Sequence, residues 1–302
     1  MLRHGSELTT NAASLEFDRF DFGYAPCCGR QLGANPGRGR SPSLLPVDVL
    51  LVVGWLAEAW RMTRGSYYIL AVMTRVLTDV PLLLMFCFIH FGMRGHGDAG
   101  DALSNAVLFA AFAGIHSLLA REGPKKILSR VVGEAFIRIA YVILSGVTLA
   151  LLLLFWRPVT GELWHARGPV SWFLTGVYFA SILGLFYVAS CFDYLEFLGL
   201  RQIERSIAGR PKSPPALSVK GPYGYCRHPM YFALLAVFWI GPVMTFGHLE
   251  FAFLGTLYLL IGVRFEEGNL RRELGADYGL YCAHVPMLIP RLTAWQGPPA
   301  VP

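Results

Sequence analysis

The sequence predicts an all-α integral membrane protein, a bundle of about six membrane-spanning helices, and three observations lead to this prediction. Of the 302 residues, 54% are hydrophobic and only 15% are charged, whereas a soluble domain carries about 25% charged residues. The apolar residues gather in blocks long enough to cross a hydrocarbon core of roughly 30 Å. The Lys and Arg residues lie between these blocks, where they orient membrane helices.

The first part of the chain, residues 1–46, is polar and rich in Gly, Arg, Ser and Pro. Such a segment cannot bury enough apolar surface to offset the entropy of ordering, so we predict a disordered extension. It lacks the charged start, apolar stretch and cleavage site of a signal peptide. Residues 47–66 follow as an amphipathic segment, which we expect to lie along the membrane interface.

The transmembrane part, residues 67–290, contains six hydrophobic spans. They are Leu70–Gly92, Ala102–Ala120, Ala135–Trp156, Val170–Phe192, Tyr231–Met244 and Leu249–Val263. The last two are too short to cross a bilayer comfortably alone. Because only four residues separate them, we expect a helical hairpin inside the bundle. Residues 291–302 form a C-terminal tail.

The basic residues alternate between the two ends of the predicted bundle. The connections after the second, fourth and sixth spans hold most of them, namely Arg121, Lys125, Lys126, Arg130, Arg201, Arg205, Arg210, Lys212, Lys220, Arg227, Arg264, Arg271 and Arg272. The opposite connections hold Arg94, Arg157 and Arg167. Basic loops stay in the cytoplasm, so both termini are predicted on the cytoplasmic side of what we expect to be a bacterial inner membrane.

Charge and cysteine content exclude two other classes of site. The net charge of +6 comes from residues without the aromatic interleaving of a single-strand nucleic-acid binder, so no nucleic-acid partner is expected. The six cysteines form no CxxC pair and no metal-type Cys/His spacing, so no metal site is expected either. The predicted partner of the apolar surface is the lipid bilayer.

An unusual polar segment, residues 221–231, leads into the fifth span. It reads Gly-Pro-Tyr-Gly-Tyr-Cys-Arg-His-Pro-Met-Tyr, and Pro229 suits the first position of a helix. The unpaired N–H groups of that helix start would then face Arg227 and His228, in a place that favours carboxylates and other electron-rich groups. Tyr, Arg and His are also ordinary headgroup anchors, so composition alone leaves an interfacial anchor open.

A second cluster follows the sixth span. Two adjacent carboxylates, Glu266 and Glu267, are costly at a membrane boundary unless they are paired or used. Glu267 can pair with Arg271 four residues later on a helix. Glu266 lies about 100° further round the helix and can face a cavity. Tyr278 and Tyr281 follow in the tail.

Taken in this order, the motifs resemble the isoprenylcysteine carboxyl methyltransferase superfamily of membrane methyltransferases. The matching segments are Gly221-Pro222-Tyr223, Arg227-His228-Pro229-Met230-Tyr231, Glu266-Glu267, Gly275 to Tyr281, and Val285-Pro286. The resemblance implies that residues 221–290 form a C-terminal cytoplasmic segment that binds S-adenosylmethionine.

A narrower resemblance points to the bacterial methanethiol S-methyltransferases, which form dimethyl sulfide. It rests on His116-Ser117, Phe192-Asp193, Gly199 to Gln202, Pro242 to His248, and Val285 to Pro290. Two departures concern one region. Ser190-Cys191 stands where the subgroup has Asn-His, and about one helical turn, Tyr194 to Glu196, is inserted after Asp193.

The resemblance also implies roles for individual residues. The expected cofactor-binding residues are Tyr223, Arg227, His228, Pro229, Tyr231, Glu266, Glu267, Tyr278 and Tyr281. Among them we expect Arg227, His228 and Glu266 to be catalytic: Arg227 holds the carboxylate of the cofactor, and either His228 or Glu266 is the base. His116 and Asp193 are candidates for the pocket of the methyl acceptor because of their position, since each lies near the cytoplasmic end of a predicted span.

Three functions remain open at this point. The leading one is S-adenosylmethionine-dependent methylation of a small thiol, with methanethiol as the expected substrate. The same fold can act on another acceptor, such as a prenylcysteine carboxylate or a lipid. The third alternative is a non-catalytic membrane protein of the same superfamily. The sequence leaves the oligomeric state open.

Overall fold

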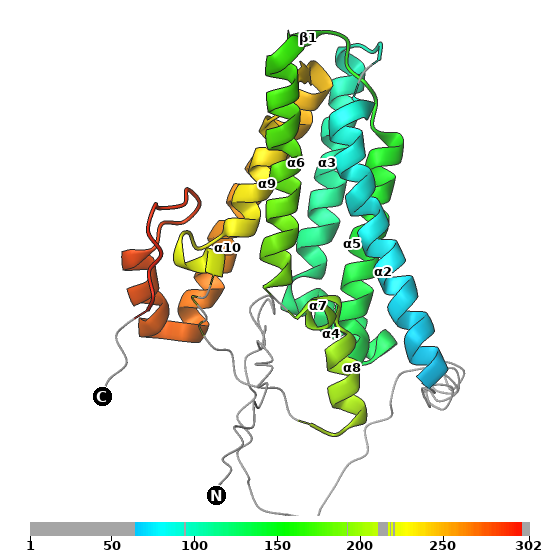
Figure 1. The fold of residues 1–302 in the computed structure, drawn as a ribbon. Helices are drawn as coiled ribbons and strands as arrows, with labels where there is room; N and C mark the ends of the chain where they lie inside the picture. The colour runs from blue at the N-terminus through cyan, green and yellow to red at the C-terminus, as the bar shows by residue number, and fades with distance from the viewer. Residues whose placement is uncertain are drawn as a thin grey trace, which may run out of the picture.

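The computed structural model describes residues 64–297, apart from 94, 192, 211–216, 218 and 220. The predictions for residues 1–46 and for most of 47–66 fall outside the described residues. The described chain forms a helical bundle (Figure 1). Its helices are α2 (Arg64–Cys87), α3 (Ala99–Leu119), α4 (Glu122–Val132), α5 (Ile137–Phe155), α6 (Gly168–Ser190), α7 (Tyr194–Leu198), α8 (Leu200–Ile207), α9 (Pro229–Trp239) and α10 (Phe246–His284).

Five of the described helices, α2, α3, α5, α6 and α10, are long and apolar enough to cross a membrane. The shorter apolar helix α9 lies between α6 and α10 in the sequence. A π-helical turn, Phe88–Gly92, extends α2. The prediction of an all-α integral membrane protein is therefore confirmed. Among the described residues, five helices are long enough to span, and the shorter α9 takes the place of one of the six expected spans.

Several helix ends follow from local sequence signals. The Asp98 side chain accepts hydrogen bonds from the backbone N–H groups of Gly100 and Asp101, and Asp101 completes a capping box at the start of α3. Proline occupies the first turn of α6 and of α9. In that turn its missing N–H has no helical acceptor to lose.

The last helix extends far beyond the last apolar span. After Val263, α10 runs on through Glu266 and Glu267 to His284, with non-helical backbone only at Gly275, where φ is +56°. Hydropathy marks where a helix leaves the apolar layer, whereas the helix ends only where its hydrogen bonds stop. The site residues of the tail are thus carried on the same helix as the last span.

The predicted hairpin between the last two spans also differs. Helix α9 ends at Trp239, and residues Val243–Thr245 form a strand, β2. It pairs antiparallel with β1 (Glu162–His165) from the connection between α5 and α6, with Glu162 opposite Thr245. This small sheet joins the two connections at one end of the bundle, the upper end in Figure 1.

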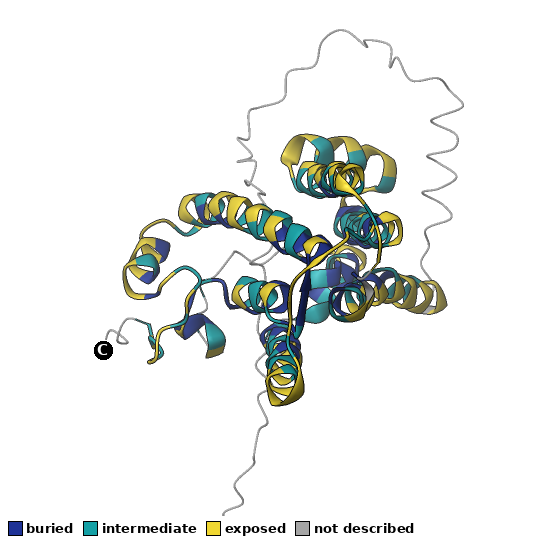
Figure 2. Cartoon of the chain, turned by 90° about the horizontal axis from the view of Figure 1, so that it is seen from above, coloured by how far each residue is buried: buried dark blue, intermediate teal, exposed yellow. Residues whose placement is uncertain are grey.

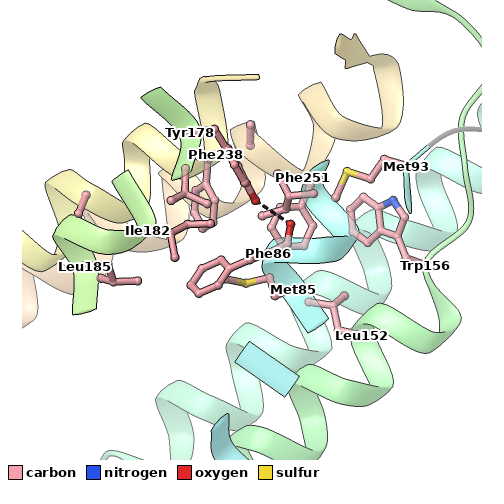
Figure 3. Close-up of a cluster of buried hydrophobic side chains, with 14 of the residues drawn as sticks. Met85, Phe86, Met93, Leu152, Trp156, Tyr178, Ile182, Leu185, Phe238 and Phe251 are labelled. Carbon is pink, nitrogen blue, oxygen red and sulfur yellow. Dashed lines mark hydrogen bonds between the residues drawn. The ribbon is translucent and has the colours of Figure 1, made fainter. Parts of the chain in front are cut away.

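The main hydrophobic core lies between α2, α3, α5, α6, α9 and α10. Figure 3 shows the Tyr178 hydroxyl pointing at the backbone carbonyl oxygen of Phe86, to which it donates a hydrogen bond of 2.7 Å. The outer sides of the helices are exposed, as Figure 2 shows, and they carry many large apolar residues. Trp172, for example, is 79% exposed. Such a belt matches a bilayer that covers the bundle.

Helices α2 and α5 approach closely at Gly146. A Cβ atom at this position would lie 1.9 Å from the backbone oxygen of Leu77. Small residues allow this kind of contact between membrane helices. The absence of a side chain at Gly146 therefore sets the distance between α2 and α5.

Candidate active site

A cavity opens at the end of α9 that is distant from the β1–β2 sheet. Its lining comes from three stretches of chain: the loop before α9, the start of α9, and the second half of α10. The lining residues are Leu217, Tyr223, Arg227, His228, Met230, Tyr231, Glu266, Leu270, Tyr278 and Tyr281. The space between these residues, counted out into open solvent, is about 460 Å³.

The backbone around Arg227 is held by the loop that follows α10, residues 285–297, which we call the post-α10 loop. The N–H groups of Arg227 and His228 donate to the carbonyl oxygens of Pro286 (2.9 Å) and Met287 (3.0 Å). In the other direction, the N–H groups of Arg291 and Trp295 donate to Tyr225 (3.0 Å) and Gly224 (2.9 Å). These bonds make the post-α10 loop part of the site.

The Arg227 guanidinium connects this loop to α10. Its Nε donates to Oε1 of Glu267 at 2.7 Å, and its Nη1 donates to the carbonyl oxygen of Val285 at 2.6 Å. Burial is the largest single effect and lowers the pKa of Arg227, but the hydrogen bond to Glu267 and the nearby negative charges, that of Glu267 first, together outweigh it and hold the pKa above its usual value. Arg227 is therefore a fixed positive charge at the edge of the cavity.

The His228 imidazole lies between the two carboxylates of α10. Its Nε2 is 3.3 Å from Oε1 of Glu267, and its Nδ1 is 3.8 Å from Oε2 of Glu266. The ring stacks on Tyr231 with 5.5 Å between centroids, and the Tyr231 hydroxyl donates to Glu266 at 2.8 Å. Because His228 is buried, this arrangement fixes its orientation and gives it a partner for a proton.

Two tyrosines of α10 complete the cavity. The Tyr281 hydroxyl donates to the carbonyl oxygen of Tyr223 at 2.7 Å. Tyr278 is 1% exposed, and its hydroxyl has no hydrogen-bond partner among the described residues. A buried hydroxyl without a partner is costly unless a ligand supplies one, so the Tyr278 hydroxyl points to a polar ligand in this cavity.

Most residues expected at the site from the sequence line this cavity: Tyr223, Arg227, His228, Tyr231, Glu266, Tyr278 and Tyr281. Pro229 is buried at the first position of α9. Glu267 lies behind Arg227 and pairs with it, while the expected partner Arg271 is further away at 3.9 Å. Sequence reasoning missed Leu217 and Leu270, whose ordinary apolar side chains belong to no motif, and it gave no role to Met230 within its motif.

The two residues expected in an acceptor pocket are not part of the cavity lining. Nε2 of His116 on α3 is 2.7 Å from the Tyr141 hydroxyl on α5, a contact between helices. Asp193 caps α7 by accepting hydrogen bonds from the N–H groups of Leu195 and Glu196, as aspartate commonly does before a helix. It also pairs with Arg201 at 2.9 Å.

The turn that the sequence inserts after Asp193 is the start of α7. Its Glu196 is buried and pairs with Arg205 of α8 at 2.6 Å. Gly199 joins the two helices with φ of +90°. The insertion thus adds an ion pair between α7 and α8, and neither of its residues lines the cavity.

The chain is similar to several curated proteins. Methanethiol S-methyltransferase 2 of Bradyrhizobium diazoefficiens is 38% identical over 196 residues, which are 65% of this chain and 76% of the relative. Methanethiol S-methyltransferase of Mycobacterium tuberculosis is 35% identical over 62% of this chain and 77% of the relative. Human nurim is 34% identical over 54% of this chain and 66% of nurim. No family model and no solved structure matches the chain.

Proposed function

The chain belongs to the methanethiol S-methyltransferase family, and we propose that it transfers a methyl group from S-adenosylmethionine to methanethiol, forming dimethyl sulfide. The observation that carries the proposal is the cavity beside α9. It combines one fixed cation, one carboxylate, several aromatic rings and a buried hydroxyl without a partner. These are the groups that a ligand with a carboxylate, a cationic sulfur, hydroxyls and an aromatic base requires.

The lining residues fit S-adenosylmethionine group by group. Arg227 is the only Lys or Arg among the described lining residues, and it suits the carboxylate of the ligand. The Tyr278 hydroxyl and the Glu266 carboxylate suit amino and hydroxyl groups. The rings of Tyr223 and Tyr281 offer faces to the adenine and to the positive sulfur. The bound cofactor supplies an electrophilic methyl group.

The protein's own part in the reaction is to deprotonate the acceptor and to keep water away. A thiol such as a free cysteine titrates near ~8.5, so a base speeds the formation of the thiolate. We assign this base to His228, with the proton held by the imidazole between Glu266 and Glu267. Leu217, Met230 and Leu270 make the wall apolar, which strengthens the electrostatic interactions inside.

We also propose an orientation in the membrane. The helices at the cavity end carry Lys125, Lys126, Arg201 and Arg205. Basic residues accumulate on the cytoplasmic side, so the cavity faces the cytoplasm, where S-adenosylmethionine is made. Both termini then lie on that side of a bacterial inner membrane.

The test is a headspace measurement of dimethyl sulfide above membranes supplied with S-adenosylmethionine and methanethiol. We expect product from the unaltered chain and at least 100-fold less from His228→Ala, the usual effect of losing a general base. His165→Ala is the matched control, because His165 is exposed at the opposite end of the bundle. We expect that variant to keep full activity.

Two results would overturn the proposal. A chain that binds S-adenosylmethionine but forms no dimethyl sulfide would send the search to carboxylate or lipid acceptors. Full activity of His228→Ala would show that His228 is not the base.

A further inference from the structure

We propose that the post-α10 loop inserts Ile289 and Leu292 into the lipid leaflet nearest the cavity and so anchors one wall of the site to the membrane. The inference does not depend on the reaction that the site performs. It starts from two apolar side chains. Leu292 is 99% exposed and Ile289 is 77% exposed, although both belong to a loop with a fixed backbone.

The backbone of the loop is tied down on both sides of these residues. Before them, Pro286 and Met287 accept the N–H groups of Arg227 and His228, and after them Trp295 donates to Gly224. The Trp295 ring stacks on His284, with centroids 5.1 Å apart and planes at 11°. The exposure of Ile289 and Leu292 is therefore a property of the folded loop.

The one charged residue between Ile289 and Leu292 is Arg291, and its guanidinium finds hydrogen-bond acceptors nearby in the chain. Arg291 donates from Nη1 to the carbonyl oxygen of His284 at 2.6 Å and from Nη2 to Thr293 at 3.3 Å. Its guanidinium is thus turned back toward the end of α10. Arg291 can therefore stay at the headgroup level while Ile289 and Leu292 enter the acyl chains.

The position of the loop selects lipid as the occupant. In Figure 1 the loop (red) turns upward from the end of α10, in the direction in which α9 runs, and Figure 2 shows this part of the chain outside the bundle. A loop that rises beside an apolar helix reaches the depth of the adjacent leaflet. On α9 itself Phe232 is also exposed.

Insertion has a consequence for the site because the loop and the site share hydrogen bonds. Val285 receives the Arg227 guanidinium, and Pro286 and Met287 receive the two N–H groups that precede α9. Lipid contact at the tip of the loop thus steadies the positions of Arg227 and His228.

The first experiment measures lipid contact directly. The full chain is made with a photoreactive benzoylphenylalanine at Leu292, at Trp172 or at Asp277, and placed in phosphatidylethanolamine–phosphatidylglycerol liposomes that contain alkyne-tagged phospholipid. Trp172 is the lipid-facing control on α6, and Asp277 is the exposed polar control on α10. We expect labelling at position 292 to be about equal to that at 172 and at least tenfold above that at 277.

Labelling at position 292 no stronger than at 277 would overturn the insertion. So would crosslinking of position 292 to a second polypeptide in place of lipid.

The second experiment tests the anchoring by hydrogen exchange in liposomes. Replacing both residues with aspartate, as Ile289→Asp with Leu292→Asp, should speed exchange at the N–H groups of Arg227 and His228 at least tenfold. The matched variant Ile289→Val with Leu292→Met should keep the original protection. Unchanged protection in the aspartate variant would contradict the anchoring.

Discussion

At the scale of single residues, Arg227 joins three segments that are far apart in the sequence. It lies before α9, its guanidinium binds Glu267 in the middle of α10, and it also binds the carbonyl oxygen of Val285 after α10. A planar guanidinium with five donors can serve all these acceptors at once, whereas a lysine ammonium cannot. Arg227 therefore has a structural task besides its proposed contact with the cofactor.

This task predicts the stability of three variants, which are Arg227→Ala, Glu267→Gln and the two combined. Arg227→Ala leaves the Glu267 carboxylate with little compensation, and losing one partner of a buried ion pair costs about 3 kcal/mol. We expect the unfolding temperature in detergent to fall clearly. Glu267→Gln added to the same chain should restore part of the loss, because the unpaired charge is gone. Losses that simply add in the double variant would show that the two side chains do not interact.

Cys226, the neighbour of Arg227, is a thiol inside a thiol methyltransferase. Burial raises the pKa of its thiol to about 11, although a backbone hydrogen bond from His228 opposes this shift. A raised thiol pKa favours the neutral form at every pH below it, so at pH 7 only about one molecule in 10⁴ carries the reactive thiolate.

The Cys226 thiol should therefore be neither methylated by the protein nor reactive toward alkylating reagents at neutral pH. We expect mass spectrometry to find no methyl group on Cys226 after incubation with S-adenosylmethionine, and slow alkylation by iodoacetamide at pH 8 that accelerates toward pH 11. Rapid alkylation at pH 7 would contradict the raised pKa.

The sequence motifs predicted which residues line the cavity, but they did not predict the ion pairs and hydrogen bonds that these residues form. Arg227 and Glu267 are 40 positions apart, and their pairing depends on how α10 folds back beside α9. His116 and Asp193 were expected at an acceptor pocket because of their place near span ends. A helix contact and a helix cap use the same residue types, so local sequence could not separate these roles.

At the scale of helices, the apolar blocks predicted where the membrane-spanning helices lie. The residues at which these helices begin and end depend on other interactions. The amphipathic second half of α10 continues the helix beyond the apolar layer, and a two-stranded sheet replaces the expected turn after α9. Strand pairing joins residues 162–165 to residues 243–245, which is a long-range contact that no local pattern reports.

The close contact of α2 and α5 gives a prediction at this scale. Gly146→Ala places a methyl group where the backbone of Leu77 now lies, and overpacking of this kind costs about 1–3 kcal/mol. We expect a lower unfolding temperature for this variant. Gly184→Ala on α6 is the matched control, because a Cβ there meets nothing within 4 Å. Equal unfolding temperatures for the two variants would show that the helices separate at little cost.

At the scale of the whole molecule, the groups of the candidate site gather at one end of α9. The other end of the bundle carries the small β1–β2 sheet. The family relatives cover about 65% of this chain. We propose that the methyltransferase domain comprises residues 67–290, and that residues 1–46 add nothing to it.

A deletion tests this division. Removing residues 1–46 should leave the rate of dimethyl sulfide formation per mole of protein within about twofold, because the composition of this polar segment predicts disorder. The measurement compares the two chains in membranes at equal protein. A loss of activity at equal expression would place part of the functional unit in the first 46 residues.

The hydrogen bonds between the post-α10 loop and Arg227 also have a genetic consequence. A nonsense codon just after that for His284 would spare the five spanning helices that the structure describes. It would nevertheless remove the carbonyl groups of Val285, Pro286 and Met287 that hold Arg227 and His228. Such an allele should behave as a null although its product still reaches the membrane. An affinity tag for purification therefore belongs at the start of the reading frame.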